Sequence, residues 1–72
     1  MKYYVVSIQN FKAGSYAQSI FAYDTREEAL SVYHSTLASN YVSDALSGFC
    51  VMVINGHGGT EVREYWEEPI PV

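Results

Sequence analysis

The sequence predicts a small α+β protein with the element order ββαββ, in which one helix packs on one face of a four-stranded antiparallel sheet. Three observations support this prediction. Two pairs of β-prone runs flank a single segment with helical periodicity. Each pair is joined by a short stretch that contains glycine, as hairpin loops often do. The 72 residues are enough for one domain, 1–72, and too few for two.

The first pair of strands is expected at residues 2–9 and 17–23, with a hairpin loop over 10–16. The run "KYYVVSIQ" has β-branched and aromatic residues on both faces. The loop "NFKAGSY" supplies the asparagine, glycine and serine that are frequent in turns. The second strand, "AQSIFAY", alternates less regularly.

The helix is expected over residues 26–42. A capping box at its start can be formed by Thr25 with Glu28, and equally well by Asp24 with Glu27. Helical spacing gathers the larger apolar side chains of this segment into one stripe that we expect to face the sheet. The stripe comprises Leu30, Tyr33, Leu37 and Tyr41, with Ala29 at its edge, His34 beside it and Val32 pointing away from it.

The second pair of strands is expected at residues 49–54 and 60–66. The run "FCVMVI" is apolar at every position, which is typical of a strand buried on both faces. The last strand carries three charged residues, which suit the edge of a sheet. Residues 66–72 follow as an acidic C-terminal tail with two prolines, which cannot continue a strand ladder.

The strand order in space follows from the connection through the helix. A strand–helix–strand crossover makes the second and third strands parallel, and the crossover itself is right-handed. If the first strand lies between them, all neighbours are antiparallel and the order is 2-1-3-4. This order also places the two most apolar strands in the centre and the charged fourth strand at an edge.

One helix covers one face, but the two central strands are apolar on both faces. An exposed contiguous apolar patch usually marks an interface, and most soluble oligomers are symmetric homo-oligomers. We therefore expect a homodimer or larger homo-oligomer; the alternative is a small-ligand-binding homo-oligomer with a tyrosine-lined pocket. The sequence does not decide which face the helix covers. The interface candidates are Tyr3, Val5, Phe49, Val51, Val53, Glu64, Tyr65, Trp66 and Glu67.

Charged residues are scarce and mostly negative. The net charge is −4 with only four lysines and arginines, so the basic footprint for direct nucleic-acid binding is missing. The acidic balance suits a basic protein partner instead. No apolar run approaches the roughly 18 residues of a membrane span, and "MKYYVVSIQ" is too short for a signal peptide. With its one free cysteine, the protein is expected to be cytoplasmic.

The stretch "NGHGGT" at residues 55–60 is the one that most resembles a functional loop. A phosphate-binding loop would continue into Lys-Ser/Thr and a helix, and an oxyanion loop would accompany a G-x-S-x-G motif; the sequence has neither. We interpret the stretch as a hairpin turn, with His57 and the helical His34 as weak ligand candidates. Cys50 is expected to be a buried, inert thiol. We expect no catalytic residue, metal or cofactor, and no enzyme.

Two stretches, "YHSTLASN" (33–40) and "VMVINGHGGTEVREYW" (51–66), resemble small proteins of Firmicutes and of their prophages and mobile elements. The resemblance covers most of the chain. It implies a bacterial or phage origin and a cytoplasmic location, and it implies no activity. By analogy with small acidic proteins of mobile elements, the expected function is a non-enzymatic interaction module that self-associates through its sheet and binds a protein partner, such as a host defence enzyme that it inhibits.

Overall fold

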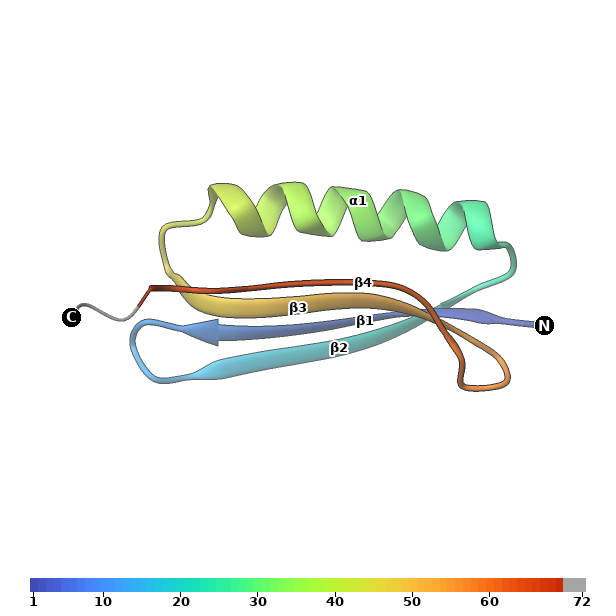
Figure 1. Ribbon diagram of the computed structural model, residues 1–72, viewed down its shortest axis with the longest axis horizontal. Helices are drawn as coiled ribbons and strands as arrows, with labels where there is room; N and C mark the ends of the chain where they lie inside the picture. Colours follow the sequence, from blue (N-terminus) through green and yellow to red (C-terminus); the bar gives the residue numbers. More distant parts are fainter. Residues whose placement is uncertain (70–72) are drawn as a thin grey trace.

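The computed structural model describes residues 1–69 and confirms the predicted architecture. Its elements are β1 (Tyr3–Phe11), β2 (Tyr16–Tyr23), α1 (Arg26–Val42), β3 (Leu46–Asn55) and β4 (Thr60–Glu67). The strands form one antiparallel sheet in the order β2-β1-β3-β4, as predicted. The helix lies along one face of this sheet, roughly parallel to the strands (Figure 1).

The β1–β2 hairpin is tighter than predicted because β1 continues to Phe11. The Phe11 N–H donates to the carbonyl of Ser15 at 2.9 Å, and the Phe11 carbonyl accepts from the Gly14 N–H at 2.9 Å. Gly14 has a φ of 97°, a conformation that glycine adopts without a steric penalty. The loop therefore shortens to residues 12–15.

Helix α1 begins and ends where the sequence predicts. Its N-cap is Thr25, whose Oγ1 accepts from the backbone N–H of Glu28 at 3.2 Å and donates to the Glu28 carboxylate at 3.1 Å. The alternative cap residue, Asp24, is instead paired with Lys2.

The face that the helix turns to the sheet matches the predicted stripe only in part: Tyr33 is buried, and Leu30 and Leu37 pack against the core. Ala29, Tyr33 and Asn40 are its buried residues, whereas Tyr41 is exposed. Val32, expected in solvent, packs against the core. The buried stripe is thus rotated by about 60° from the predicted one at 3.6 residues per turn. Ala29 and Tyr33 both belong to the buried core cluster.

Strand β3 begins three residues before the predicted position, at Leu46. The side chain of Leu46 is fully buried, and its neighbour across the ladder is Phe11. The β1–β3 register shifts between Asn10 and Phe11, which leaves Ser47 as an extra residue on β3. At the other end of the chain, β4 extends to Glu67, so the first residues of the predicted tail belong to the strand. Residues 70–72 of that tail lie outside the described residues.

The main core lies between the helix and the sheet, and this corrects the prediction of interface residues. Tyr3, Val5, Phe49, Val51 and Val53 all point to the helix, and all except the half-buried Tyr3 are buried. They were interface candidates because every position of β3 is apolar, so alternation could not distinguish the two faces. The uncovered face carries the even-numbered residues of β1 and β3, because side chains alternate along a strand.

Candidate interaction surface

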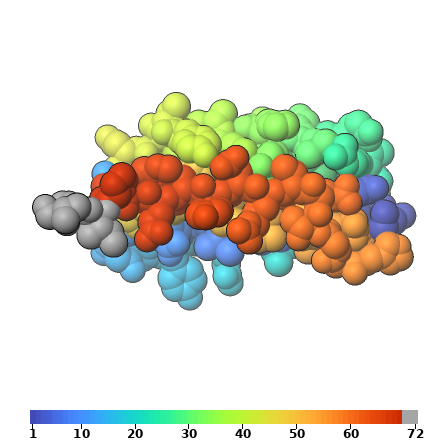
Figure 2. Space-filling view, viewed as in Figure 1, coloured from blue at the N-terminus to red at the C-terminus, as the bar shows by residue number. Residues whose placement is uncertain are grey.

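The open face is the side of the sheet that the helix leaves uncovered. Residues directly opposite one another across an antiparallel ladder share a face, so the register defines its members. Its apolar residues on the inner strands are Tyr4, Val6 and Ile8 of β1 and Cys50, Met52 and Ile54 of β3. Strand β2 adds Tyr16, Ile20 and Ala22, and β4 adds Tyr65. Blue and cyan side chains of the first hairpin protrude on the side away from the helix (Figure 2).

Charges are nearly absent from the open face. Of the three carboxylates in strands, Glu61 and Glu64 lie on the helix side and only Glu67, at the end of β4, lies on the open side. Arg63 lies opposite Met52, and its guanidinium stands 5.3 Å from the centre of the Tyr65 ring. Within residues 1–69, Arg63 is the one lysine or arginine without a carboxylate partner.

A groove of about 500 Å³ lies at one end of this face. Ile8, Cys50, Arg63, Tyr65 and Glu67 are among the residues that line it. It contains a single tyrosine, so it differs from the tyrosine-lined pocket that the sequence suggested as an alternative. Ile8 is its only aliphatic side chain, and Arg63 and Glu67 place one charge of each sign along it.

The acidic and aromatic candidates on β4 do not form one surface. Because side chains alternate along a strand, Glu64 and Trp66 point to the helix side while Tyr65 and Glu67 point to the open face. Trp66 is half-buried, with its ring 6.0 Å from that of Phe49. Glu64 is exposed. The predicted acidic edge is therefore divided between two sides of the sheet.

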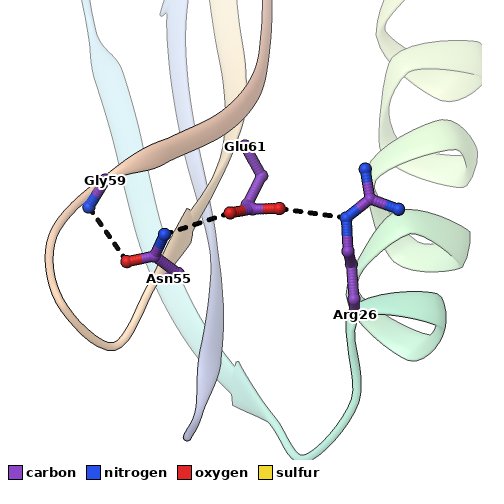
Figure 3. A network of polar contacts seen from close by, with 4 residues as sticks. All are labelled: Arg26, Asn55, Gly59 and Glu61. Carbon is purple, nitrogen blue, oxygen red and sulfur yellow. Dashed lines mark hydrogen bonds and ion pairs between the residues drawn. The ribbon is translucent and has the colours of Figure 1, made fainter.

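The "NGHGGT" stretch is held as a turn by the side chain of Asn55. Its Oδ1 accepts from the backbone N–H of His57 at 2.9 Å and of Gly59 at 3.0 Å. Its Nδ2 donates to Glu61 at 3.0 Å, and the other oxygen of Glu61 accepts from Arg26 Nε at 3.0 Å. Figure 3 shows this network joining the loop to the start of the helix. The backbone N–H groups of His57 and Gly59 are thus hydrogen-bonded within the loop and stabilise the turn.

These contacts hold the pKa of Glu61 below its usual value, first through the hydrogen bond from Asn55 and then through Arg26. The contacts with Asn55 and Arg26 therefore favour the ionised form of Glu61.

The two histidines do not converge on a site. His57 is exposed in the loop, and His34 is exposed on the helix, where its ring lies 5.1 Å from that of Tyr33. Neither lines the groove. Cys50 corrects another expectation: it is half-buried on the open face. No cluster of three or more His, Cys, Asp or Glu side chains that could hold a metal occurs in the described part of the chain.

Sequence reasoning missed one buried polar residue, Asn40. It is 4% exposed, and its Oδ1 accepts from Gln9 Nε2 at 2.7 Å. Its Nδ2 has no acceptor among residues 1–69. Asn40 also lines a cavity of about 140 Å³ beside Tyr41, Phe49 and Trp66, which is large enough to admit water. The signal in the sequence was its helical spacing from Tyr33, which places it on the core face.

Comparisons with known proteins identify no relative, so a proposal for the function rests on the geometry of the sheet and its surfaces. A scan against protein-family models and searches of curated proteins and of solved structures found no match. In residues 1–69, α1 is neither long nor apolar enough to cross a membrane.

Proposed function

We propose that this chain is a non-enzymatic protein-interaction module that self-associates through the open face of its sheet. One observation carries the proposal. A chain with a net charge of −4 keeps one sheet face apolar and almost free of carboxylates. Self-association through the acidic sides would bring like charges together, whereas two open faces meet without that repulsion.

The size of the open face is compatible with a dimer. Four strands about 4.8 Å apart and about eight residues long give a flat footprint on the order of 500 Å², before the relief of the side chains is added. Specific interfaces bury about 600–1,000 Å² of accessible surface on each partner. A second copy stacked on this face would therefore supply the second layer that a sheet with two apolar faces needs.

Sedimentation equilibrium with a charge introduced at Met52 tests this assignment. Met52 lies between Val6 and Arg63, so a glutamate there meets a cation in the monomer but is buried in the dimer. Met52→Glu should lower the association constant by at least tenfold. Ser35→Glu adds the same charge on the exposed side of the helix and should leave association unchanged. Equal association of Met52→Glu and wild type would exclude the open face as the interface.

We further propose that a basic protein partner binds the acidic side of the module. Glu64 is exposed on the helix side of β4, and Glu27 and Glu28 lie in the first helical turn. In a bacterial lysate, Glu64→Lys should lose a partner that wild type and Ser35→Lys both retain. If the partner is a defence enzyme, wild type should also inhibit its activity and Glu64→Lys should not. Retention of the same proteins by all three chains would contradict this assignment.

A further inference from the structure

The two edges of the sheet are protected very differently. The outer strand β4, "TEVREYWE", has four charged residues and an extra residue, Glu61, in its ladder with β3. Both features discourage pairing with another strand. The other outer strand, β2, reads "YAQSIFAY". It has no charged residue and no proline, and its register with β1 is regular over its whole length.

The hydrogen bonds of the hairpin show which backbone groups of β2 are free. Because the Phe11 N–H donates to Ser15, this pair is hydrogen-bonded, and such pairs then alternate along the ladder. The odd residues of β2 therefore direct their N–H and C=O groups to β1. The even residues direct theirs away from the sheet; these are Tyr16, Gln18, Ile20 and Ala22.

We propose that β2 pairs antiparallel with β2 of a second copy of this chain, across a two-fold axis at Ser19. This register places Tyr16 opposite Ala22 and Gln18 opposite Ile20 in both directions. Every outward-facing N–H and C=O of the strand then has a partner, with two hydrogen bonds for each such pair. The product is a continuous antiparallel sheet of two copies with both helices on the same side.

The side chains of β2 complement one another in this register. Tyr16, Ile20 and Phe21 are 72%, 66% and 59% exposed, which is high for apolar side chains in a strand. On the open side, each Tyr16 comes to lie beside the small Ala22 of the second copy. On the helix side, each Phe21 lies beside the small Ala17. Large side chains thus meet small ones at each end, and the uncharged centre at Ser19 meets its own copy without repulsion.

The edge interface is distinct from the open face and does not depend on the proposed function. Edge pairing has its two-fold axis perpendicular to the sheet, whereas stacking of open faces has its axis between two sheets. Both interfaces are isologous, and together they can close into a tetramer. The two proposals can therefore fail or succeed separately.

Amide hydrogen exchange followed by NMR on the wild-type chain tests the edge directly. In a monomer the amides of Gln18, Ile20 and Ala22 should exchange rapidly, while those of Ala17 and Ser19 are protected by β1. If β2 pairs with a second copy, exchange at the amides of Gln18, Ile20 and Ala22 should slow at least tenfold as the protein concentration rises. Rapid exchange at these amides in a fully associated sample would overturn the proposal.

A proline at an outward position provides the matching variant. Gln18→Pro removes an N–H that β1 does not use, so the monomer should fold and edge pairing should be lost. Ala17→Pro, one residue away, removes an amide that bonds to β1 and should destabilise the hairpin. If Gln18→Pro itself fails to fold, the exchange measurement on wild type decides alone.

Sedimentation of combined variants separates the two interfaces. If both form, Met52→Glu and Gln18→Pro each halve the wild-type mass, and the double variant is a monomer of 8.1 kDa. If the edge does not pair, Gln18→Pro leaves the mass unchanged and Met52→Glu alone gives a monomer. This pair of results refutes edge pairing. If the open face does not associate, Gln18→Pro alone gives a monomer, which supports edge pairing and refutes the proposed function.

Discussion

Truncation of Val51 tests which face of the sheet the helix covers. Val51 is fully buried beneath the helix, in the centre of β3. Val51→Ala removes two methyl groups, each worth about 0.8 kcal/mol of transfer free energy. The space left behind, roughly 40 Å³, adds about 1 kcal/mol at ~24 cal/mol per Å³. We therefore expect a loss of about 2.5 kcal/mol, from a total stability of about 4–10 kcal/mol for a domain of this size.

The matched control is Val6→Ala, because Val6 is the same residue type in a central strand but is only half-buried on the open face. It should cost less than about 1 kcal/mol in the monomer. Urea titration, followed by Trp66 fluorescence and far-UV circular dichroism at a concentration where the protein is monomeric, measures both. The midpoint should fall by about 1–2 M for Val51→Ala, with the slope unchanged. If Val6→Ala costs as much as Val51→Ala, the helix covers the other face and the open face is wrongly assigned.

Three further experiments test the fold around the candidate surfaces. Asn55→Ala should lower the unfolding free energy by about 1–2 kcal/mol in urea titration, because two loop amides lose their acceptor. The control His57→Ala should change it by less than about 0.5 kcal/mol. A larger effect of His57→Ala would contradict a purely structural loop. Burial, and secondarily Glu64, raises the pKa of Tyr33 above 10.0. The buried neutral phenol therefore stabilises the fold fully below pH 10.0, and this stabilisation is lost as the pH rises further. Tyr33→Phe should flatten the alkaline loss of unfolding free energy, and an unchanged pH profile would refute the burial of this phenol as its cause. A double-mutant cycle of Gln9→Ala and Asn40→Ala should give a coupling of about 1 kcal/mol, and additive effects would show that their hydrogen bond contributes nothing.

The architecture was predictable because its signals are local and agree with one another. Hydrophobic periodicity located the helix, and the two alternative capping boxes, at Asp24 and Thr25, placed its start to within one residue. The strand order followed from handedness and from placing charge at the edge. These features depend on sequence neighbours, so one chain contains the information.

The assignment of faces depends on packing between distant elements and could not be predicted in the same way. Since β3 is apolar at each position from Phe49 to Ile54, its alternation favours neither face. The predicted helix stripe included the large Tyr41, which is exposed, and left the small Ala29, which is fully buried, at its edge. Asn40 was overlooked because its partner, Gln9, lies 31 residues away in sequence.

The open face itself was anticipated as a surplus of apolar residues, but of its members only Tyr65 and Glu67 were among the predicted interface residues. Once the register is known, the same reasoning selects Val6, Met52 and Ile54 in place of Val5, Val51 and Val53. The backbone groups of β2 that face outward could be identified only from the alternation of the hairpin hydrogen bonds, which the sequence pattern does not contain.

The rate at which a thiol reagent labels Cys50 tests the central claim most directly. Cys50 is the only cysteine, and it is half-buried on the open face. It lies two strands away from the outer edge of β2, so edge pairing alone does not cover it. If open faces associate, the labelling rate should fall at least tenfold as the concentration rises into the high micromolar range, and Met52→Glu should abolish this fall. A labelling rate that is independent of concentration would contradict self-association through the open face.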